Sequence, residues 1–545
     1  MTKVLLVGLD GATWDIIKPL AASGRLPNLA YLMRRGASGP LRSTIPPVTP
    51  AAWTTVFTGK NPGKHGIYDF QELNPQTYEF ATVRTDQHHE KTIWQLLTEH
   101  GQRSVILDVP FTYPPRPFNG LMLTGYGTPR TPGTVFTFPR DLRQRLPAEL
   151  QQEIRVALPR HSFDRSPRFI EEWARVMDGR QRLLDYLLKT EAWDFFMVVF
   201  SITDNMAHVF WTYVDPAHPN FQAPQAEMYR NALLEAYQQC DRLLGELMEA
   251  AGPNALSLVI SDHGFGSVRP RQYLFRRLLQ GGYVTPQSTM PGPQAGRRLM
   301  KLALEAYLRL PILREWAKNL RPKGRNLVKR SLNKAGMMPT EGNIDFSGSQ
   351  LIPTNFGLRM WVNEQGRFGR GIVPPERKET LLEELEAFLL SDVDPIKKTP
   401  VIRAVYRGQD LYHGPYAENC PDVIIEYENM FNLYDPAPPT NPHVEGGHTL
   451  EGILLAYGPG VRTGEVTGGQ LHDIAPIVLH ALGHEIPPDM DGEIPHGLFT
   501  ESYLAQNPVR MGTEAAHLPD TEVGDGYTEE EDSEIREQLR QLGYL

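Results

Sequence analysis

Three short, continuous apolar runs constrain the fold of this chain most strongly. They span Lys3–Leu9, Trp193–Ile202 and Ala255–Ile260, and such runs are typical of strands that are buried on both faces of a parallel sheet. Helical patterns cover Phe169–Leu188 before the second run and Ala223–Ala251 after it. Strands that alternate with helices in this way predict a doubly wound α/β fold, in which helices flank a mostly parallel sheet.

Each of these apolar runs is followed by acidic or histidine side chains. Because the carboxyl ends of parallel strands form the ligand-binding edge of such a sheet, we expect these side chains to lie close together. Three carboxylates and three imidazoles, one of them from a later segment, are a ligand set that suits two zinc or manganese ions. Taken singly, each residue also has a structural explanation, since aspartates cap helices and histidines occur in turns. The set is Asp10, Asp204, His208, Asp262, His263 and His448.

Thr49 is the candidate nucleophile. It is followed at once by Pro50, and a threonine N-cap with proline at the first helical position predicts a helix that continues through Ala51–Phe57. The free N–H groups of a helix start suit a phosphate, which the hydroxyl of Thr49 would face. Two cations about 4 Å apart clamp the attacking and leaving oxygens of a phosphoryl displacement, and metal coordination activates such a hydroxyl. Thr-Pro taken alone is also an ordinary helix cap.

The sequences of several segments, and their order along the chain, resemble the motifs of the alkaline phosphatase superfamily, in its branch of type I phosphodiesterases and nucleotide pyrophosphatases. The chain looks particularly like the predicted phosphohydrolase/phosphomutase members of bacteria and archaea. The resemblance covers most of the chain outside Arg297–Lys334. The segments that carry it are LLVGLDGATW, PPVTPAAWTTVFTGKNPGKHGIYDF, SITDNMAHVFW, VISDHGFG, GGHTLEGILLAYGPG and LHDIAPIVLHALG.

The resemblance implies an alkaline-phosphatase-like fold and a metal-dependent phosphohydrolase that cleaves a phosphate mono- or diester. Thr49 would form a covalent phosphothreonine, which water then hydrolyses. Two divalent ions are implied, with zinc as the first choice and manganese as the alternative. One ion would be held by Asp10, Thr49, Asp262 and His263, and the other by Asp204, His208 and His448.

The turn after the candidate nucleophile departs from the family pattern. Members that act on nucleotide diesters usually carry an asparagine after the His-Gly-Ile turn, where it holds a phosphate oxygen. Here His65-Gly66-Ile67 is followed by Tyr68 and Asp69, and Phe70 stands at that place. The residue that would bind this phosphate oxygen is therefore unassigned, as are the other substrate-binding residues.

Two other functions remain open at the level of the sequence. A phosphoglycerate-mutase-like phosphomutase would use the same metals with a hydroxyl nucleophile. A non-catalytic metal-binding scaffold would keep the fold without the reaction, because a fold alone does not imply activity. A sulfatase would need a Cys or Ser in a Cys/Ser-x-Pro-x-Arg setting, and neither Cys240 nor Cys420 lies in one.

Four segments are expected along the chain. Residues 1–265 and 441–505 form the metal-binding α/β core, and residues 341–440 form an α+β cap. Residues 266–340 form a basic helical insertion, and residues 506–545 an acidic C-terminal tail with a short helix. Within the core, the Pro-, Gly- and Thr-rich segment Val109–Arg140 predicts a long surface excursion near the site.

Charge and length set expectations about partners and location. The net charge of −9 argues against a nucleic-acid partner. Arg297–Lys334 nevertheless holds twelve Lys or Arg residues against two Glu, which is either a solvated helical surface or one that binds an anionic membrane or a lipid-linked phosphate substrate. The sequence shows neither the pattern of a signal peptide nor an apolar run long enough to span a bilayer. The prediction is a cytoplasmic protein, and its two cysteines exclude a disulfide framework and a cysteine-based zinc cluster.

Overall fold

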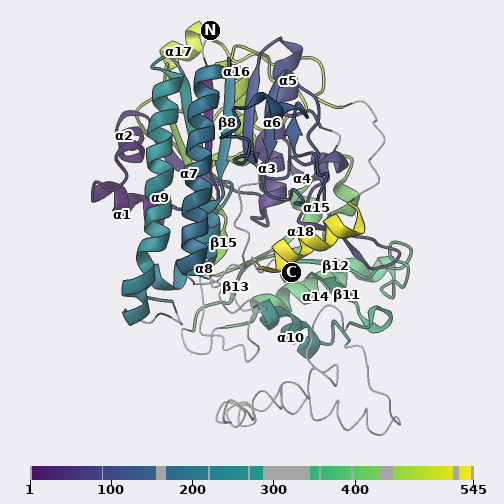
Figure 1. Ribbon diagram of the computed structural model, residues 1–545. Coiled ribbons are helices and arrows are strands. Elements are labelled where there is room, and N and C mark those ends of the chain that lie inside the picture. The colour runs from purple at the N-terminus through teal and green to yellow at the C-terminus, as the bar shows by residue number, and fades with distance from the viewer. Residues whose placement is uncertain are drawn as a thin grey trace.

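A computed structural model shows the arrangement of the chain (Figure 1). It describes all residues except 1–2, 89, 155–166, 219–220, 222, 268–270, 286–343, 355–357, 394–397, 429–445, 519–526 and 542–545. The basic segment Arg297–Lys334 therefore lies outside the described residues, and the prediction of a helical insertion there stays a prediction.

One large sheet forms the centre of the described structure. Its strands are β1 (Val4–Leu9), β2 (Ala37–Arg42), β5 (Ser104–Val109), β6 (Gly120–Thr124), β7 (Thr137–Phe138), β8 (Phe195–Phe200), β9 (Leu256–Ile260), β16 (Glu451–Tyr457), β17 (Gly464–Glu465) and β18 (Gly469–Gln470). They lie in the order β17-β2-β16-β9-β1-β8-β5-β6-β7, with β18 beside β2. The neighbours from β9 to β6 are parallel, whereas β16 is antiparallel to both β9 and β2. The predicted mostly parallel sheet is confirmed.

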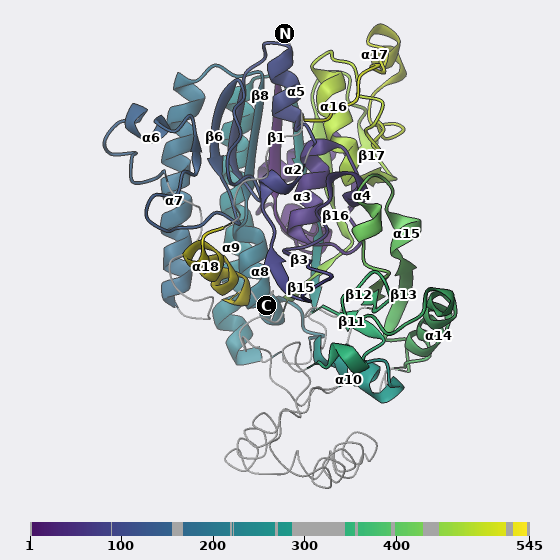
Figure 2. The same ribbon diagram turned by 90° about the vertical axis from the view of Figure 1, so that its right-hand side faces the viewer.

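Helices cover both faces of this sheet. Figure 2 shows α7 (Pro167–Thr190) and α9 (Ala223–Ala251) on one side and α3 (Thr49–Thr58), α5 (Ile93–Glu99) and α16 (Ile474–Ala481) on the other. The helices α1 (Trp14–Ala22), α2 (Pro27–Arg35) and α8 (Ile202–Val214) also pack on the α9 side.

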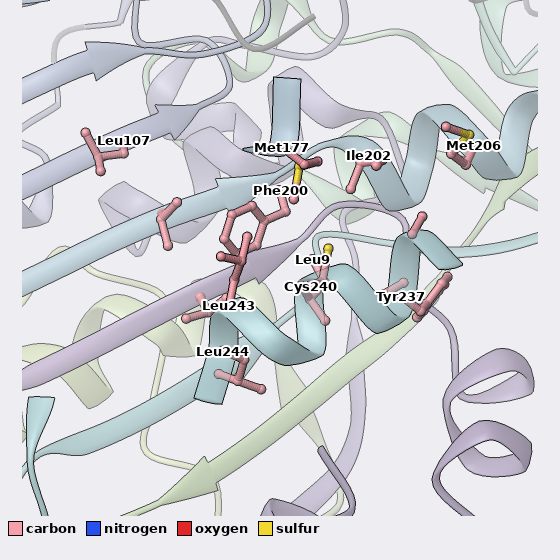
Figure 3. Packing of buried hydrophobic residues seen from close by; sticks show 14 of the residues in the cluster. Leu9, Leu107, Met177, Phe200, Ile202, Met206, Tyr237, Cys240, Leu243 and Leu244 are labelled. Atoms are coloured by element: carbon pink, nitrogen blue, oxygen red, sulfur yellow. The ribbon is translucent and has the colours of Figure 1, made fainter. Parts of the chain in front are cut away.

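The alternation along β1 shows why the helices lie on two faces. Leu5 and Val7 belong to the apolar cluster on the α9 side, whereas Val4 and Leu6 belong to the cluster on the α3 side, because successive side chains of a strand point to opposite faces. Figure 3 shows the first cluster from close by, with Leu9 near the inward face of α9. A strand buried on both faces has to be apolar throughout, which is the pattern that the sequence shows.

A smaller antiparallel sheet forms the predicted α+β cap, below the main sheet in Figure 2. Its strands lie in the order β11-β12-β14-β13, and α14 packs against them. The bounds are β11 (Leu351–Pro353), β12 (Arg359–Val362), β13 (Ile402–Arg407), β14 (Val423–Tyr427) and α14 (Lys378–Leu390). The domain boundaries that the sequence suggests stay predictions.

The remaining elements are short connections and paired strands. They are α4 (Pro62–His65), α6 (Leu142–Arg145), α10 (Arg271–Gly281), α15 (Gly408–Leu411), α17 (Glu501–Gln506), α18 (Glu529–Gln541), and the pairs of β3 (Gln71–Leu73) with β4 (Phe80–Thr82) and β10 (Gly264–Ser267) with β15 (Gly446–Thr449). The C-terminal helix α18 packs on the body of the protein, because Ile535 and Leu539 are buried and Arg536 donates to the carbonyl oxygen of Phe80 at 2.6 Å.

The interpretation of Val109–Arg140 as a surface excursion is wrong in part. The segment contains β6, which pairs in parallel with β5, and four of its five residues are buried. This strand is only five residues long and is surrounded by proline and glycine. Those neighbours dominate the composition of the segment and hide the apolar run.

Candidate active site

Most of the candidate metal ligands lie at one edge of the sheet because they follow the carboxyl ends of its strands. Asp10 comes directly after β1, and Asp262 and His263 come two and three residues after the end of β9. Asp204 lies in the first turn of α8, which begins two residues after β8. The central strands are in register, with Leu6 opposite both Met197 and Leu258, so their ends meet at the same level.

The first cluster joins Asp204, His208 and His448. Asp204 and His208 are four residues apart on α8 and so share one helical face, with 3.4 Å between Oδ1 of the aspartate and Nε2 of the histidine. His448 comes from β15, and its Nε2 lies 3.3 Å from the same aspartate oxygen and 3.1 Å from Nε2 of His208. Pairing of β15 with β10 places His448 opposite Phe265 and thereby holds it at the site.

The second cluster joins Asp10, Asp262 and His263. Nε2 of His263 lies 3.3 Å from Oδ2 of Asp262 and 3.6 Å from Oδ1 of Asp10. The two clusters are adjacent, since the rings of His263 and His448 stack with their centroids 3.5 Å apart. The structure thus brings together the carboxylates and histidines of each predicted ligand set; that they bind metal stays a prediction.

Backbone carbonyl oxygens orient the histidines toward these clusters. Nδ1 of His448 is 2.9 Å from the carbonyl oxygen of Pro47, and Nδ1 of His263 is 3.1 Å from that of Gly264. Because a carbonyl can only accept, Nδ1 is the donor in each ring, and Nε2 keeps its lone pair. A histidine ligand held by its other nitrogen is the usual arrangement in metal sites.

Unpaired buried atoms show that the residues fit divalent cations. Within the described chain, Oδ1 of Asp10, Oδ2 of Asp262 and Nε2 of His263 are buried and make no hydrogen bond. Buried charges of this kind are normally paired or bound to metal. The inward-facing N and O atoms of each cluster lie within 4.8 Å of one another, and imidazole with carboxylate is a donor set that suits zinc or manganese.

The pKa shifts of the clustered aspartates and histidines also indicate a site that favours a bound cation. Burial raises the pKa of Asp262 to about 8, and the negative charge of Asp204 adds to the rise. Burial, then Asp262 and Asp204, also raise the pKa of Asp10 well above its ordinary value. Burial opposes ionisation of Asp204 as well, but His208 and His448 outweigh it and keep the pKa of Asp204 low. Burial lowers the pKa of His263 and of His448, which keeps both rings neutral.

Thr49 begins α3 beside these clusters. The prediction of Thr49 as the N-cap is one position too late, because Val48 is the N-cap and Thr49 is the first helical residue. Trp53, one turn later on the same helical face, donates from Nε1 to Oδ2 of Asp10 at 3.3 Å. Since Pro47 in turn binds His448, contacts to both clusters flank Thr49. Its predicted role as a metal ligand stays a prediction.

Several supporting residues were not identified from the sequence. Thr203 donates to the carbonyl oxygen of Asp10 at 2.6 Å, and the N–H of Gly11 donates to Oδ1 of Asp262 at 3.3 Å. Gly11 has a φ of +65°, and a Cβ there would lie 2.9 Å from Oδ1 of Asp204. Its place directly after Asp10 in a strand exit is the one sequence signal that pointed to such a turn.

A third acidic and histidine cluster has a different character. Glu90, Asp489 and His517 converge elsewhere in the described structure. Lys60 is fully buried between Glu90 and Asp489, and its ammonium also donates to the carbonyl oxygen of Ala516 at 3.0 Å. A lysine already supplies the positive charge here, so this cluster is a buried ion-pair network that ties the C-terminal segment to the end of α3.

Comparison with known protein families decides the assignment. The family model described as type I phosphodiesterase/nucleotide pyrophosphatase matches residues 4–449. The chain belongs to this family. The type I phosphodiesterase/nucleotide pyrophosphatase family is a branch of the alkaline phosphatase superfamily, as the motifs indicate, and the chain is a hydrolase that acts on phosphoric ester bonds.

The solved structures that match the chain share little sequence with it. Human ectonucleotide pyrophosphatase/phosphodiesterase 5 matches with 14% identity and a TM-score of 0.47, covering 93% of this chain and 99% of that one. Its murine counterpart matches with 13% identity and a TM-score of 0.49, covering 92% and 100%. Phosphonoacetate hydrolase from Sinorhizobium meliloti, in complex with phosphonoacetate, matches with 13% identity and a TM-score of 0.48, covering 88% and 95%. No curated protein matches the chain.

The helices also bear on membrane insertion. Of the helices that the structure describes, none combines the length and the apolar character that crossing a bilayer requires.

Proposed function

We propose that the chain hydrolyses a phosphate mono- or diester through a covalent phosphothreonine at Thr49, in a centre that binds two divalent ions. The observation that carries this proposal is the pair of adjacent three-residue clusters with contacts on both sides of the first turn of α3. A nucleophile beside two cation sites is the arrangement that phosphoryl transfer requires.

We assign the proposed ligands to two ions as the resemblance implies. Bound zinc, or manganese as the alternative, would stabilise negative charge on the phosphoryl oxygens and on the attacking oxygen. One ion would be held by Asp10, Thr49, Asp262 and His263, and the other by Asp204, His208 and His448.

The chain's own residues have separate tasks in this proposal. No side chain caps the start of α3 among the described residues. Pro50 has no N–H and the N–H of Ala52 donates to the carbonyl oxygen of Val48, so the N–H groups of Thr49 and Ala51 are the ones that a phosphoryl oxygen could use. Trp53 fixes Asp10, and Pro47 fixes the ring of His448. Thr49 is only 4% exposed, which limits the access of bulk water and strengthens electrostatic contacts to the reacting group.

Contacts between the cap and the Thr49 segment support a role for the cap in substrate choice. Asp69 forms a buried ion pair with Arg359 of β12, and Tyr412 donates to the carbonyl oxygen of Ile45. Asn61 donates to the carbonyl oxygen of His413 at 3.0 Å. The cap is therefore attached on both sides of Thr49 in the sequence, where it would border a bound substrate.

Hydrolysis of simple substrates tests the proposal. Purified protein loaded with zinc or manganese should hydrolyse an aryl phosphate or a bis-aryl phosphate, and a chelator should abolish the activity because the carboxylate clusters then lose their counter-charge. Equal rates with and without chelator would contradict the two-ion centre. Isomerisation of a phosphorylated sugar or acid without net phosphate release would favour the phosphomutase alternative.

The partners and location inferred from the sequence are also part of this proposal. Cys240 and Cys420 are free and buried, which agrees with a reducing, cytoplasmic compartment. We propose a phosphate-ester substrate that is either a small molecule or linked to a lipid, and contact with an anionic membrane through Arg297–Lys334.

Vesicle binding tests the membrane contact. Each cation near an anionic surface contributes about 1 kcal/mol, so the full chain should cosediment with anionic but not neutral vesicles, and less at high salt. Neutralising Arg321, Lys323, Arg325, Lys329 and Arg330 should weaken this binding. Negligible binding under all conditions would contradict the membrane contact.

A further inference from the structure

Tyr126 is a buried tyrosine whose hydroxyl has no hydrogen-bond partner among the residues that the structure describes. It follows β6 by two residues, at the same edge of the sheet as Asp10 and Asp204. The residue is 7% exposed, and its hydroxyl makes no hydrogen bond to any residue that the structure describes. Buried tyrosine hydroxyls usually find a partner, because an unpaired buried donor costs free energy.

The surroundings of this hydroxyl connect it to the metal clusters. Burial raises the pKa of Tyr126 well above its ordinary value, and the negative charges of Asp204 and then Asp10 raise it further. The phenol group is therefore within electrostatic reach of both clusters. It stays protonated at neutral pH and acts as a donor that needs an acceptor.

Two phenylalanine rings hold Tyr126 in place. Phe70 packs edge-on against it with centroids 6.2 Å apart and an interplanar angle of 85°, and Phe111 packs at 6.3 Å and 70°. Such perpendicular contacts are favourable for aromatic pairs. Phe70 is the residue that stands where the sequence leaves a phosphate contact unassigned, so the aromatic ring at this position supports a polar side chain instead of supplying one.

Contacts and close packing hold the backbone around Tyr126 in one conformation. The N–H of Phe111 donates to the carbonyl oxygen of Tyr126 at 2.8 Å. Phe111 and Asp108 have φ values of +56° and +57°, which cost free energy for residues other than glycine and tend to occur at functional sites. A Cβ on Gly125 would lie 2.2 Å from the carbonyl oxygen of Asp108, so only glycine permits this close approach.

We propose that the hydroxyl of Tyr126 donates a hydrogen bond to a non-bridging oxygen of the substrate's phosphoryl group. This inference rests on the proposed function and assigns the phosphate contact that Phe70 cannot make. A phosphoryl oxygen is the acceptor that the hydroxyl lacks, and it would lie between the two clusters and the start of α3. Tyr126 is then a catalytic residue, because the charge on that oxygen changes during the reaction.

Tyr126→Phe tests the contact, because it removes the hydroxyl and keeps the ring. We expect kcat for an aryl phosphate ester to fall by about 10²-fold, as for the loss of one donor to a developing charge, with a smaller change in KM. Inorganic phosphate, used as a competitive inhibitor, should bind about tenfold more weakly. The content of divalent ions should stay at the wild-type level.

Tyr237→Phe is the matched control. Tyr237 is also buried and lies within electrostatic reach of Asp204, but its hydroxyl accepts a hydrogen bond from the N–H of Thr13 at 3.3 Å. Its loss should leave kcat and phosphate binding unchanged. A drop in activity of equal size in both variants would overturn the proposal, because it would reflect general damage to the site.

Thermal unfolding of the metal-free variants gives a readout that does not depend on activity. Tyr126→Phe should unfold at the same temperature as wild type or higher, because the hydroxyl has no partner to lose in the described part of the chain. Tyr237→Phe should unfold at a lower temperature, because the N–H of Thr13 loses its acceptor. A lower unfolding temperature for Tyr126→Phe would show a structural role for its hydroxyl and would overturn the proposal.

The outcome also separates this inference from the proposed function. Absence of hydrolysis by the metal-loaded wild type would overturn the proposed function, and binding of inorganic phosphate to wild type and Tyr126→Phe would still decide on Tyr126. Wild-type hydrolysis with full activity of Tyr126→Phe would overturn the Tyr126 contact alone.

Discussion

Replacing Thr49 with alanine is expected to lower kcat for an aryl phosphate or bis-aryl phosphate by about 10³-fold or more, as for the loss of other covalent nucleophiles. The variant keeps every member of the two three-residue clusters, so the reaction loses its attacking oxygen, which is also one proposed ligand of an ion, while the six other proposed ligands stay. The hydroxyl of Thr49 caps no helix, since Val48 is the N-cap of α3. The unfolding temperature should therefore stay close to that of wild type.

Two further variants make this result specific. Thr49→Ser keeps a hydroxyl and should retain a measurable part of the activity. Thr58→Ala makes the same change at the other end of α3, where Thr58 donates to the carbonyl oxygen of Thr54 at 2.6 Å, and it should keep the wild-type kcat. Turnover of Thr49→Ala within tenfold of wild type would remove Thr49 as the nucleophile, whatever the other variants do.

The fold and the candidate metal ligands were largely predictable from the sequence because they depend on local patterns. The apolar run before Asp10 predicts a buried strand, and a buried parallel strand delivers its next residue to the ligand-binding edge of the sheet. Asp204 and His208 share a face because four residues make about one helical turn. The sequence alone could not show that His448 completes this cluster, and its assignment rested on the family resemblance.

The contacts that support the site were not predictable, because they join distant segments. Trp53 binds Asp10 across 43 positions of the chain, and Pro47 binds His448 across 401. Tyr126 was hidden for a related reason. It follows a short buried strand inside a segment rich in proline and glycine. The observation that points to it, a buried hydroxyl without a hydrogen-bond partner among the described residues, cannot be read from sequence.

The position of Thr49 shows a smaller limit of sequence reasoning. A threonine before proline predicts an N-cap, yet the helix begins one residue earlier and Thr49 is helical. Helix boundaries commonly differ by one or two residues. Here the difference matters, because a hydroxyl engaged in capping would have to give up that hydrogen bond before it could attack a phosphoryl group.

His448→Ala is expected to remove one of the two divalent ions and most of the activity. Wild-type protein should bind about two ions per chain. His448 comes from β15, whereas Asp204 and His208 both belong to α8, so its loss leaves that cluster with ligands from one helix only. The second cluster keeps Asp10, Asp262 and His263, and elemental analysis of the variant should find about one ion per chain.

The metal content and the unfolding temperature of the variants together test whether His448 is a metal ligand. His484→Ala is the control, because His484 stacks on His100 and binds Gln102 near the start of β5, at the opposite edge of the sheet. It should keep both ions. Because ions that bind only the folded state raise its stability, metal should raise the unfolding temperature of His484→Ala as much as that of wild type, and that of His448→Ala by less. Two ions bound to His448→Ala would exclude His448 as a ligand, since no other change in that variant could restore a lost site.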